Sequence, residues 1–508
     1  MEKSKGRGPS SPQPAGPPPT AAQPALVAAT SGLPWTVTWC VLGALFISLL
    51  WYPVSKLSAH YSFGSNEGFN TAFQAMAAAG AKVYGNPPVY SYANYPPISF
   101  HLIAWLSAVT HDVNLTGRWL SFLAYLAIGG LIALIVSRLI RSRALGAYAA
   151  ACWLIWLPAF DAGRVGLNDP HLLGVAFNLA GLYFFVRDPE TNRGAAISAA
   201  VFAISLFTKQ SLVAIPAAVA IYLFLSSRKR LAVWLAAAVG TSLALLALTL
   251  VVDGKYFFDH LFLPRMYFAS DAWGSLGAYL YFTQVAFLLA LIWMLRATQH
   301  SVTGLFIWAL PLTHVLATYY CGGAGAGVNH FFDGMIVIAI LTGLALPSLL
   351  RLAEGTRYPR ATLSFLLIGP CFLTSFVALA RRLPADFAHP ADETAKMETE
   401  FSGVSSYIKG QPGAALCESQ LLCYAAGKPY TYDPFSADQL VRTGRIPLEQ
   451  LVQLIDRKEY RVIQLDWPSN EALQPSPRVR FPGPVMRALF VSYQPAIRSA
   501  KYVVFTAK

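Results

Sequence analysis

The sequence predicts a mainly α-helical, polytopic membrane protein of about eleven transmembrane helices that carries a small α/β domain at its C-terminal end. The first reason is composition: of 508 residues, 55% are hydrophobic and only 12% charged, whereas soluble domains are charged at about a quarter of their positions. The second is a series of apolar runs between residues 33 and 380. The third is the return of charge and of period-two patterns in residues 381–508.

The chain opens with a polar segment, residues 1–32, rich in Pro, Ala, Ser and Gly. It contains no long apolar run, which indicates a disordered cytoplasmic tail. The run at 33–52 follows without a signal-type cleavage site, so we expect an uncleaved span there. Ten further spans are expected at 119–140, 147–160, 170–186, 195–207, 212–225, 231–252, 276–295, 302–320, 332–350 and 361–379.

Basic residues indicate the topology. The formal net charge is +13, but Lys and Arg stand in short clusters between apolar runs, as the positive-inside bias places them, so no nucleic-acid partner is indicated. The cluster at 141–143 therefore faces the cytoplasm, and the loop 53–97 faces outward. The apolar run Ile98–Thr110 is too short for an ordinary crossing. It is expected to be an interfacial or re-entrant helix, with a short span as the alternative.

Residues 381–508 are expected to form an α/β domain on the outer face. Period-two segments at 461–467 and 501–508 alternate with an amphipathic pattern at 447–460. Cys417 and Cys423 lie close together in this domain, and an oxidising compartment favours a short-loop disulfide between them.

Two acids on the outward side are candidates for chemistry, because charge beside a bilayer is costly. Glu67 lies in the polar loop after the first span. It is either a solvated or capping acid or a general base that deprotonates an acceptor hydroxyl. Asp169 precedes Pro170 at the start of a span, where a helix N-cap and a substrate-binding acid predict the same residues.

Cations and amides complete the candidate set. Lys209 and Gln210 form an outward corner, and Arg265 lies in an aromatic loop; each cation is either a phosphate ligand or a snorkelling side chain. The glycine-rich segment 321–333 lacks the pattern of a nucleotide-binding loop, and its Asn329, His330 and Asp333 are expected to face a ligand. No HExxH or paired CxxC motif is present, so no metal site is predicted.

Five short motifs follow one another over about residues 60–350: Asn66-Glu67, Tyr95-Pro96-Pro97, Arg118, Asn168-Asp169-Pro170 and Lys209-Gln210. In this order they resemble the GT-C superfamily of membrane glycosyltransferases, especially polyprenyl-phosphate-sugar-dependent enzymes such as aminoarabinose and galacturonic-acid transferases and protein O-mannosyltransferases. With their neighbours, the candidate substrate-binding residues are Asn66, Asn70, Tyr95, Arg118, Arg164, Asn168, His171, Lys209, Gln210, Arg265, Asn329, His330 and Asp333.

The resemblance implies inverting sugar transfer from a polyprenyl-phosphate donor to a glycan, lipid or protein acceptor. It places a catalytic transmembrane region at 33–380 in a bacterial inner membrane, with the N-terminus cytoplasmic and 381–508 periplasmic. No cofactor is required, and a divalent cation is optional. Asn66 stands where the family usually has Asp, so the base role falls to Glu67, or else to Asp169. A transporter or flippase of a lipid-linked saccharide and an envelope-assembly scaffold are the alternatives.

Overall fold

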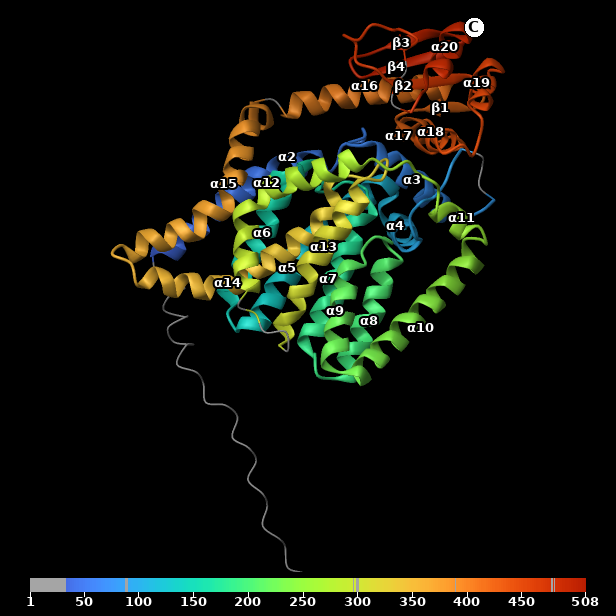
Figure 1. Ribbon diagram of the computed structural model, residues 1–508. Helices are drawn as coiled ribbons and strands as arrows, with labels where there is room; N and C mark the ends of the chain where they lie inside the picture. Colours follow the sequence, from blue (N-terminus) through green and yellow to red (C-terminus); the bar gives the residue numbers. More distant parts are fainter. Residues whose placement is uncertain are drawn as a thin grey trace, which may run out of the picture.

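A helical bundle with a small domain resting on one end is the architecture of the computed structural model (Figure 1). The structure describes residues 33–86, 90–295, 297, 301–388, 390–476, 478 and 480–508, so the predicted tail 1–32 lies outside the described residues. The helices of the bundle and of its loops are α2 (Leu33–Lys56), α3 (Ser65–Ala78), α4 (Ile98–Thr110), α5 (Val113–Ile140), α6 (Arg143–Asp161), α7 (Pro170–Arg187), α8 (Asn192–Leu206), α9 (Ala214–Ser226), α10 (Arg228–Val252), α11 (Phe257–Leu261), α12 (Ala269–Met294), α13 (Leu305–Cys321), α14 (Phe332–Glu354) and α15 (Pro359–Ala388).

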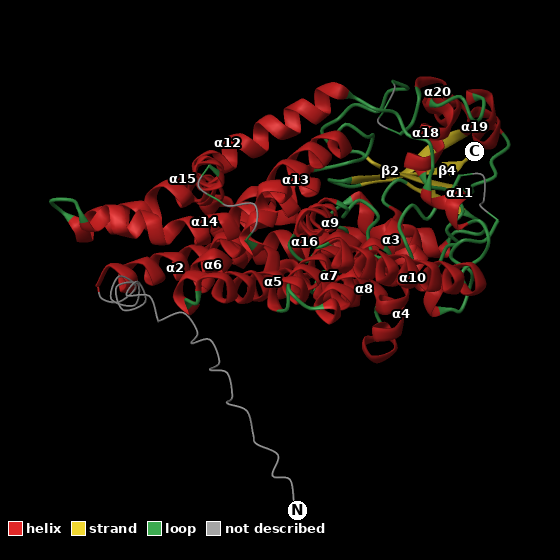
Figure 2. Ribbon diagram, turned by 60° about the horizontal axis from the view of Figure 1, so that its bottom comes forward, coloured by secondary structure: helices red, strands yellow, loops and turns green. Residues whose placement is uncertain are grey.

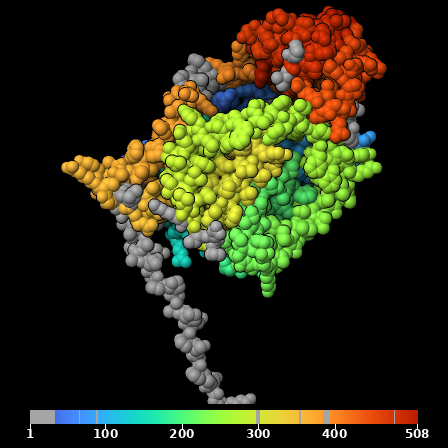
Figure 3. All heavy atoms as spheres, in the orientation of Figure 1, coloured from blue at the N-terminus to red at the C-terminus, as the bar shows by residue number. Residues whose placement is uncertain are grey.

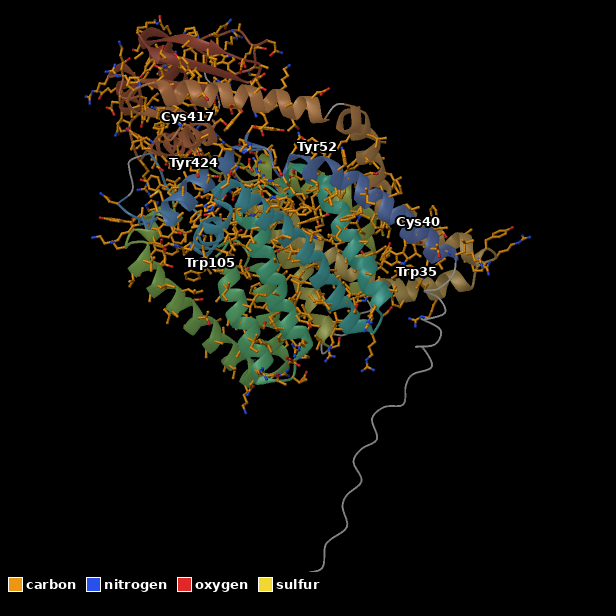
Figure 4. All side chains as sticks on the ribbon, turned by 180° about the vertical axis from the view of Figure 1, so that it is seen from behind. Trp35, Cys40, Tyr52, Trp105, Cys417 and Tyr424 are labelled. Atoms are coloured by element: carbon orange, nitrogen blue, oxygen red, sulfur yellow. A yellow bond between two sulfur atoms is a disulfide. The ribbon has the colours of Figure 1, made fainter. Side chains whose placement is uncertain are left out.

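Every predicted span coincides with one of these helices, and the fold-class prediction is confirmed. Among the described residues, eight helices are long and apolar enough to cross a membrane: α2, α5, α6, α10, α12, α13, α14 and α15. The remaining three predicted spans fall on α7, α8 and α9, so the total of eleven stays a prediction. Helix α4 is a short apolar helix whose Trp105 is 72% exposed (Figure 4). This exposed face suits contact with lipid tails.

Helix α5 begins earlier than its apolar run. The run predicts a start at 119, but the helix begins at Val113, because the carboxylate of Asp112 accepts a hydrogen bond from the backbone N–H of Leu115 over 2.8 Å. Such a cap satisfies a donor that the first turn leaves unpaired. Arg118 therefore lies within the helix, where packing fixes its side chain.

The C-terminal domain, Pro390 to Lys508, contains a four-stranded sheet confined to one corner of the molecule (Figure 2). The strand order is β1-β2-β4-β3, with β1 parallel to β2 and the other pairs antiparallel. The predicted strands and helix are present as β2 (Val462–Asp466), β4 (Tyr502–Ala507) and α19 (Leu448–Asp456). The other elements are α16 (Pro390–Gly410), β1 (Ala415–Cys417), α17 (Gln420–Ala425), α18 (Pro434–Arg442), α20 (Gly483–Ser492) and β3 (Tyr493–Arg498).

Both faces of this sheet are covered. Ile463 and Leu465 of β2 pack in one apolar cluster with α19 and α20, whereas Val462 packs in a second cluster with α16 and α17. The second cluster also contains Ala59 and Tyr61 from the loop that follows α2. The sheet is therefore joined through apolar contacts to the first loop of the bundle.

Helix α17 makes the closest approach between the two parts. Cys417 and Cys423 are bonded through their sulfur atoms, and the loop that they close includes the first turn of α17. This helix packs on α3 at Gly68, where an added Cβ would lie 2.3 Å from the backbone nitrogen of Leu421. A glycine is needed at this crossing. Figure 4 labels Cys417 and Tyr424 in the C-terminal domain, and Figure 3 shows this domain in orange and red on top of the bundle.

Candidate active site

Glu67 and Arg118 form a buried ion pair between α3 and α5. Both side chains are fully buried; Arg118 Nε donates to Glu67 Oε1 and Nη2 donates to Oε2, each over 2.8 Å. The carboxylate also accepts hydrogen bonds from the backbone N–H groups of Phe63, over 2.7 Å, and Asn168, over 3.3 Å. A carboxylate with four donors and no exposure has little capacity to take a substrate proton. The geometry therefore argues against the predicted base role of Glu67.

Arg118 is likewise held by the protein. Its guanidinium donates to the carbonyl oxygens of Ala59 and Tyr61 and lies 3.8 Å from the centre of the Phe63 ring. All of these partners belong to the loop between α2 and α3. The predicted substrate-binding role of Arg118 is replaced by a structural one, because the guanidinium is buried and occupied.

Asn168 organises a buried amide network on the other side of α3. Its side-chain amide bonds with Gln74 in both directions over 2.8 Å and donates to Thr71 and Asn114, each over 3.2 Å. Its backbone carbonyl accepts from Asn70 over 2.9 Å. Asn70 and Asn168, predicted to bind substrate, instead fix α3 to the loop that precedes α7.

Asp169 lies beside this network, and each of its carboxylate oxygens accepts one hydrogen bond and can accept another. It caps α7 by accepting from the His171 N–H over 2.9 Å, and its other oxygen accepts from Asn66 Nδ2 over 3.2 Å. Burial by itself raises the pKa of Asp169, but Lys209 and Arg164 outweigh it and lower the pKa to about 2. The folded protein therefore carries an ionised carboxylate here throughout the physiological range.

Lys209 lies at the corner between α8 and α9 with only 5% of its surface exposed. Its ammonium sits 3.7 Å from the centre of the Tyr95 ring. Within the described part of the chain, no carboxylate or other acceptor forms an ion pair or hydrogen bond with it. A sequestered ammonium that lies on an aromatic face and forms no hydrogen bond or ion pair with a described residue can accept an anionic ligand.

A polar cavity of about 80 Å³ lies beside these groups, under the C-terminal domain. Asn66 and Tyr95, which touch Asp169 and Lys209 respectively, both line it. The remaining lining residues are Phe69 of α3 and Asn94 before α4, Arg265 before α12 and Gly325 after α13, and Gln420, Asp433, Phe435 and Arg480 of the C-terminal domain.

Several other predicted residues adjoin this region. Arg164 pairs with Asp161 over 3.4 Å and lowers the pKa of Asp169, and its guanidinium would lie 2.8 Å from a Cβ added at Gly327. His171 accepts from the amide of Asn329 over 3.0 Å, and its ring lies 5.8 Å from that of His330.

Gln210 and Asp333 are engaged within the protein. Gln210 donates to the Asn94 carbonyl over 2.9 Å. Asp333, predicted to face a ligand, lies inside the bundle at the start of α14 and accepts from Asn178 over 3.4 Å, so it is not brought to the cavity.

The C-terminal residues of the cavity were not predicted. Gln420 lies between the two disulfide cysteines and Asp433 lies just before α18, and neither segment has a pattern typical of a binding site; the docking of α17 on α3 brings Gln420 to the cavity. Among the described residues, no three His, Cys, Asp or Glu side chains are grouped to hold a metal ion. The optional role of a divalent cation stays a prediction.

Comparisons with known proteins concern the fold and the central segment of the chain. A family model described as dolichyl-phosphate-mannose-protein mannosyltransferase matches residues 94–253, a segment that includes Tyr95, Asp169 and Lys209. No curated protein matches the chain. Among solved structures, ArnT from Cupriavidus metallidurans bound to undecaprenyl phosphate has a TM-score of 0.60 and 15% identity, over 94% of this chain and 98% of that one.

Two further structures have the same fold. ArnT in the apo state gives a TM-score of 0.60 at 14% identity, over 93% of this chain and 97% of that one. The oligosaccharyltransferase AglB from Archaeoglobus fulgidus, in complex with an inhibitory peptide and a dolichol-phosphate, gives 0.50 at 12% identity, over 84% of this chain and 69% of that one. The family match is thus confined to residues 94–253, and the likeness to the solved structures shows a shared fold over most of the chain.

Proposed function

We propose that the protein transfers a sugar, with inversion, from a polyprenyl-phosphate donor to a hydroxyl acceptor on the periplasmic side of a bacterial inner membrane. The observation that carries this proposal is the convergence of an ionised acid, Asp169, and an ammonium that pairs with no described carboxylate, Lys209, beside one polar cavity at the end of the bundle. Sugar transfer of this kind needs a proton acceptor and a cation at the leaving phosphate.

Asp169 is the base in this proposal. It takes the proton of the acceptor hydroxyl as that oxygen attacks the anomeric carbon, and the bond from the anomeric carbon to the phosphate oxygen breaks. Its hydrogen bond to Asn66 orients one oxygen, and the helix cap orients the other. Asn66 thus supports the carboxylate from the position where the family usually has Asp.

The departing polyprenyl phosphate takes the bonding electrons, and Lys209 stabilises its added charge. Arg265, which lines the same cavity from the loop before α12, is a second cation for this phosphate. Side-chain cations are sufficient for a monophosphate leaving group, so a metal ion is optional.

An apolar groove of about 320 Å³ supports a site for the lipid tail. It lies between α4 and α10 and includes Pro97 and Phe207. Each of these is two residues from a partner in the Tyr95–Lys209 contact. A phosphate at Lys209 would therefore have an apolar surface nearby for its isoprenoid chain.

The first test is Lys209→Met. It removes the charge and keeps most of the side-chain volume, so the expected result is a loss of about 100-fold in affinity for undecaprenyl phosphate, the size of a buried charge-assisted contact. Binding is measured on the full chain in lipid nanodiscs. Arg228→Met, at the opposite end of the bundle, is the control and should bind as wild type. Unchanged affinity in Lys209→Met would remove the phosphate assignment.

The pH dependence gives a second test. Lys209 and Arg164 hold the pKa of Asp169 at about 2 in the folded protein, below the ordinary 3.8. Folding therefore favours the ionised carboxylate, and the stability gained in this way is lost only as the pH falls through the pKa of the folded protein. Wild-type transfer should therefore show no acid limb from this group above about pH 4. In Lys209→Met the pKa of Asp169 should rise, so the fall in transfer rate at acidic pH should begin at a higher pH. The rate is measured in single turnovers at saturating donor. A limb that stays in place would contradict the coupling.

A further inference from the structure

Two amide oxygens in the cavity have no hydrogen-bond partner. Asn94 Oδ1 and Gln420 Oε1 are buried and have no hydrogen-bond partner among the described residues; the Tyr430 hydroxyl, itself without a partner, lies near the Gln420 side chain. The residues are only 7% and 5% exposed, and both line the polar cavity. A buried carbonyl oxygen without a donor costs free energy comparable to a lost hydrogen bond. These two oxygens therefore indicate that a bound ligand supplies the missing hydrogen-bond donors.

The orientation of Gln420 follows from its neighbour. Its Nε2 donates to Asp433 Oδ1 over 2.6 Å, and an ionised carboxylate can only accept. The amide nitrogen must therefore face Asp433, which leaves Oε1 as the free atom. Asp433 is itself fixed, since it caps α18 by accepting from the N–H groups of Phe435, over 3.2 Å, and Ser436, over 3.0 Å.

The position of Gln420 depends on the docking of the C-terminal domain. It is the first residue of α17, within the loop closed by Cys417 and Cys423. Its Cβ lies against Gly68 of α3, one residue from Glu67 and two from Asn66. The contact that joins the C-terminal domain to the bundle thus brings the Gln420 amide beside the start of α3, which carries Asn66 and Glu67.

We infer that Gln420, with Asn94, is a specificity-determining residue whose amide oxygen accepts a hydrogen bond from an O–H or N–H group on the sugar ring of the polyprenyl-phosphate sugar. The inference rests on the proposed function and names the substrate feature that this site recognises. Aromatic side chains of Phe69, Tyr95 and Phe435 line the same cavity and offer faces against which a sugar ring packs. The C-terminal domain then contributes directly to the choice of sugar.

The experiment measures binding by the full chain in phosphatidylethanolamine–phosphatidylglycerol nanodiscs. The probes are undecaprenyl phosphate and its glucose, galactose, mannose and arabinose derivatives, each as the parent sugar and as every monodeoxy form. Wild type should bind at least one parent about 10-fold or more tightly than one of its deoxy forms, because a site built for a hydroxyl rejects the analogue that lacks it. Gln420→Met should reduce that ratio to about twofold or less.

Gln439→Met is the matched control. This buried glutamine also lies where the C-terminal domain meets the bundle, but its Oε1 accepts from the Met266 N–H over 2.8 Å and it does not line the cavity. It should keep the wild-type ratio even if stability falls. Asn94→Ala, on a different segment, tests the second oxygen and serves if Gln420→Met does not fold.

The outcomes separate the two proposals. A wild type that binds undecaprenyl phosphate but distinguishes no parent from its deoxy forms would overturn the inference and leave the donor assignment standing. The inference is likewise overturned if Gln420→Met and Asn94→Ala both keep the wild-type ratio. If wild type binds neither undecaprenyl phosphate nor any derivative, the proposed function falls and the inference falls with it.

Discussion

Asp169→Asn is expected to lower kcat about 1,000-fold while changing donor affinity less than about threefold. General-base catalysis contributes about 100- to 10,000-fold, and an amide cannot take the acceptor proton. Asn is an equally good N-cap, so the bond to the His171 N–H and the start of α7 should remain. The rate is measured as sugar transfer from the undecaprenyl-phosphate derivative that wild type uses, with affinity measured in parallel.

A matched control is available at another helix start. Asp112 caps α5 through the Leu115 N–H, as Asp169 caps α7. Asp112→Asn makes the same chemical change away from the cavity and should retain more than about half of the wild-type rate. If Asp169→Asn retains as much activity as Asp112→Asn, Asp169 is not the base, and its carboxylate serves only as a cap.

The main helices and strands could be predicted from the sequence. Apolar runs mark helices directly, because a bilayer leaves few other ways to satisfy the backbone. Asn66 and Asp169, two of the residues that carry the resemblance, are in contact although 103 positions apart. The first loop and the corner at Lys209 are likewise brought together, through Tyr95.

The roles of individual residues were harder to predict, because they depend on which partner each one finds. Glu67 and Arg118 each looked functional when taken alone. A buried arginine in an apolar helix needs an acid, and Glu67 is the single acid in the first loop, residues 53–97, so the pairing rule for charges near membranes could have found the contact. Gln420 offered no such signal, because its unpaired oxygen is a property of the docked structure.

If Glu67 is structural, replacing it should lower the free energy of unfolding. If it were the base, replacing it should lower turnover alone. Glu67→Gln should destabilise the protein by about 3–5 kcal/mol, because it leaves the Arg118 guanidinium charged, buried and without a counter-ion. Arg118→Met should cost a similar amount for the converse reason. Both are measured as unfolding midpoints of the purified chain, against Asp188→Asn, which breaks the half-exposed Arg187–Asp188 pair and should change stability by less than about 0.5 kcal/mol.

The double variant Glu67→Gln with Arg118→Met gives the sharper result. It removes both charges together, so it should be less destabilised than the sum of the single variants. Recovery should be incomplete, since Arg118 also holds the carbonyl oxygens of Ala59 and Tyr61 in the loop on which the C-terminal domain rests. If Glu67→Gln instead unfolds like wild type and loses turnover, the ion pair is not structural. Glu67 would then return as the base, because the first loop would fold without the pair and its carboxylate would be free to meet the acceptor.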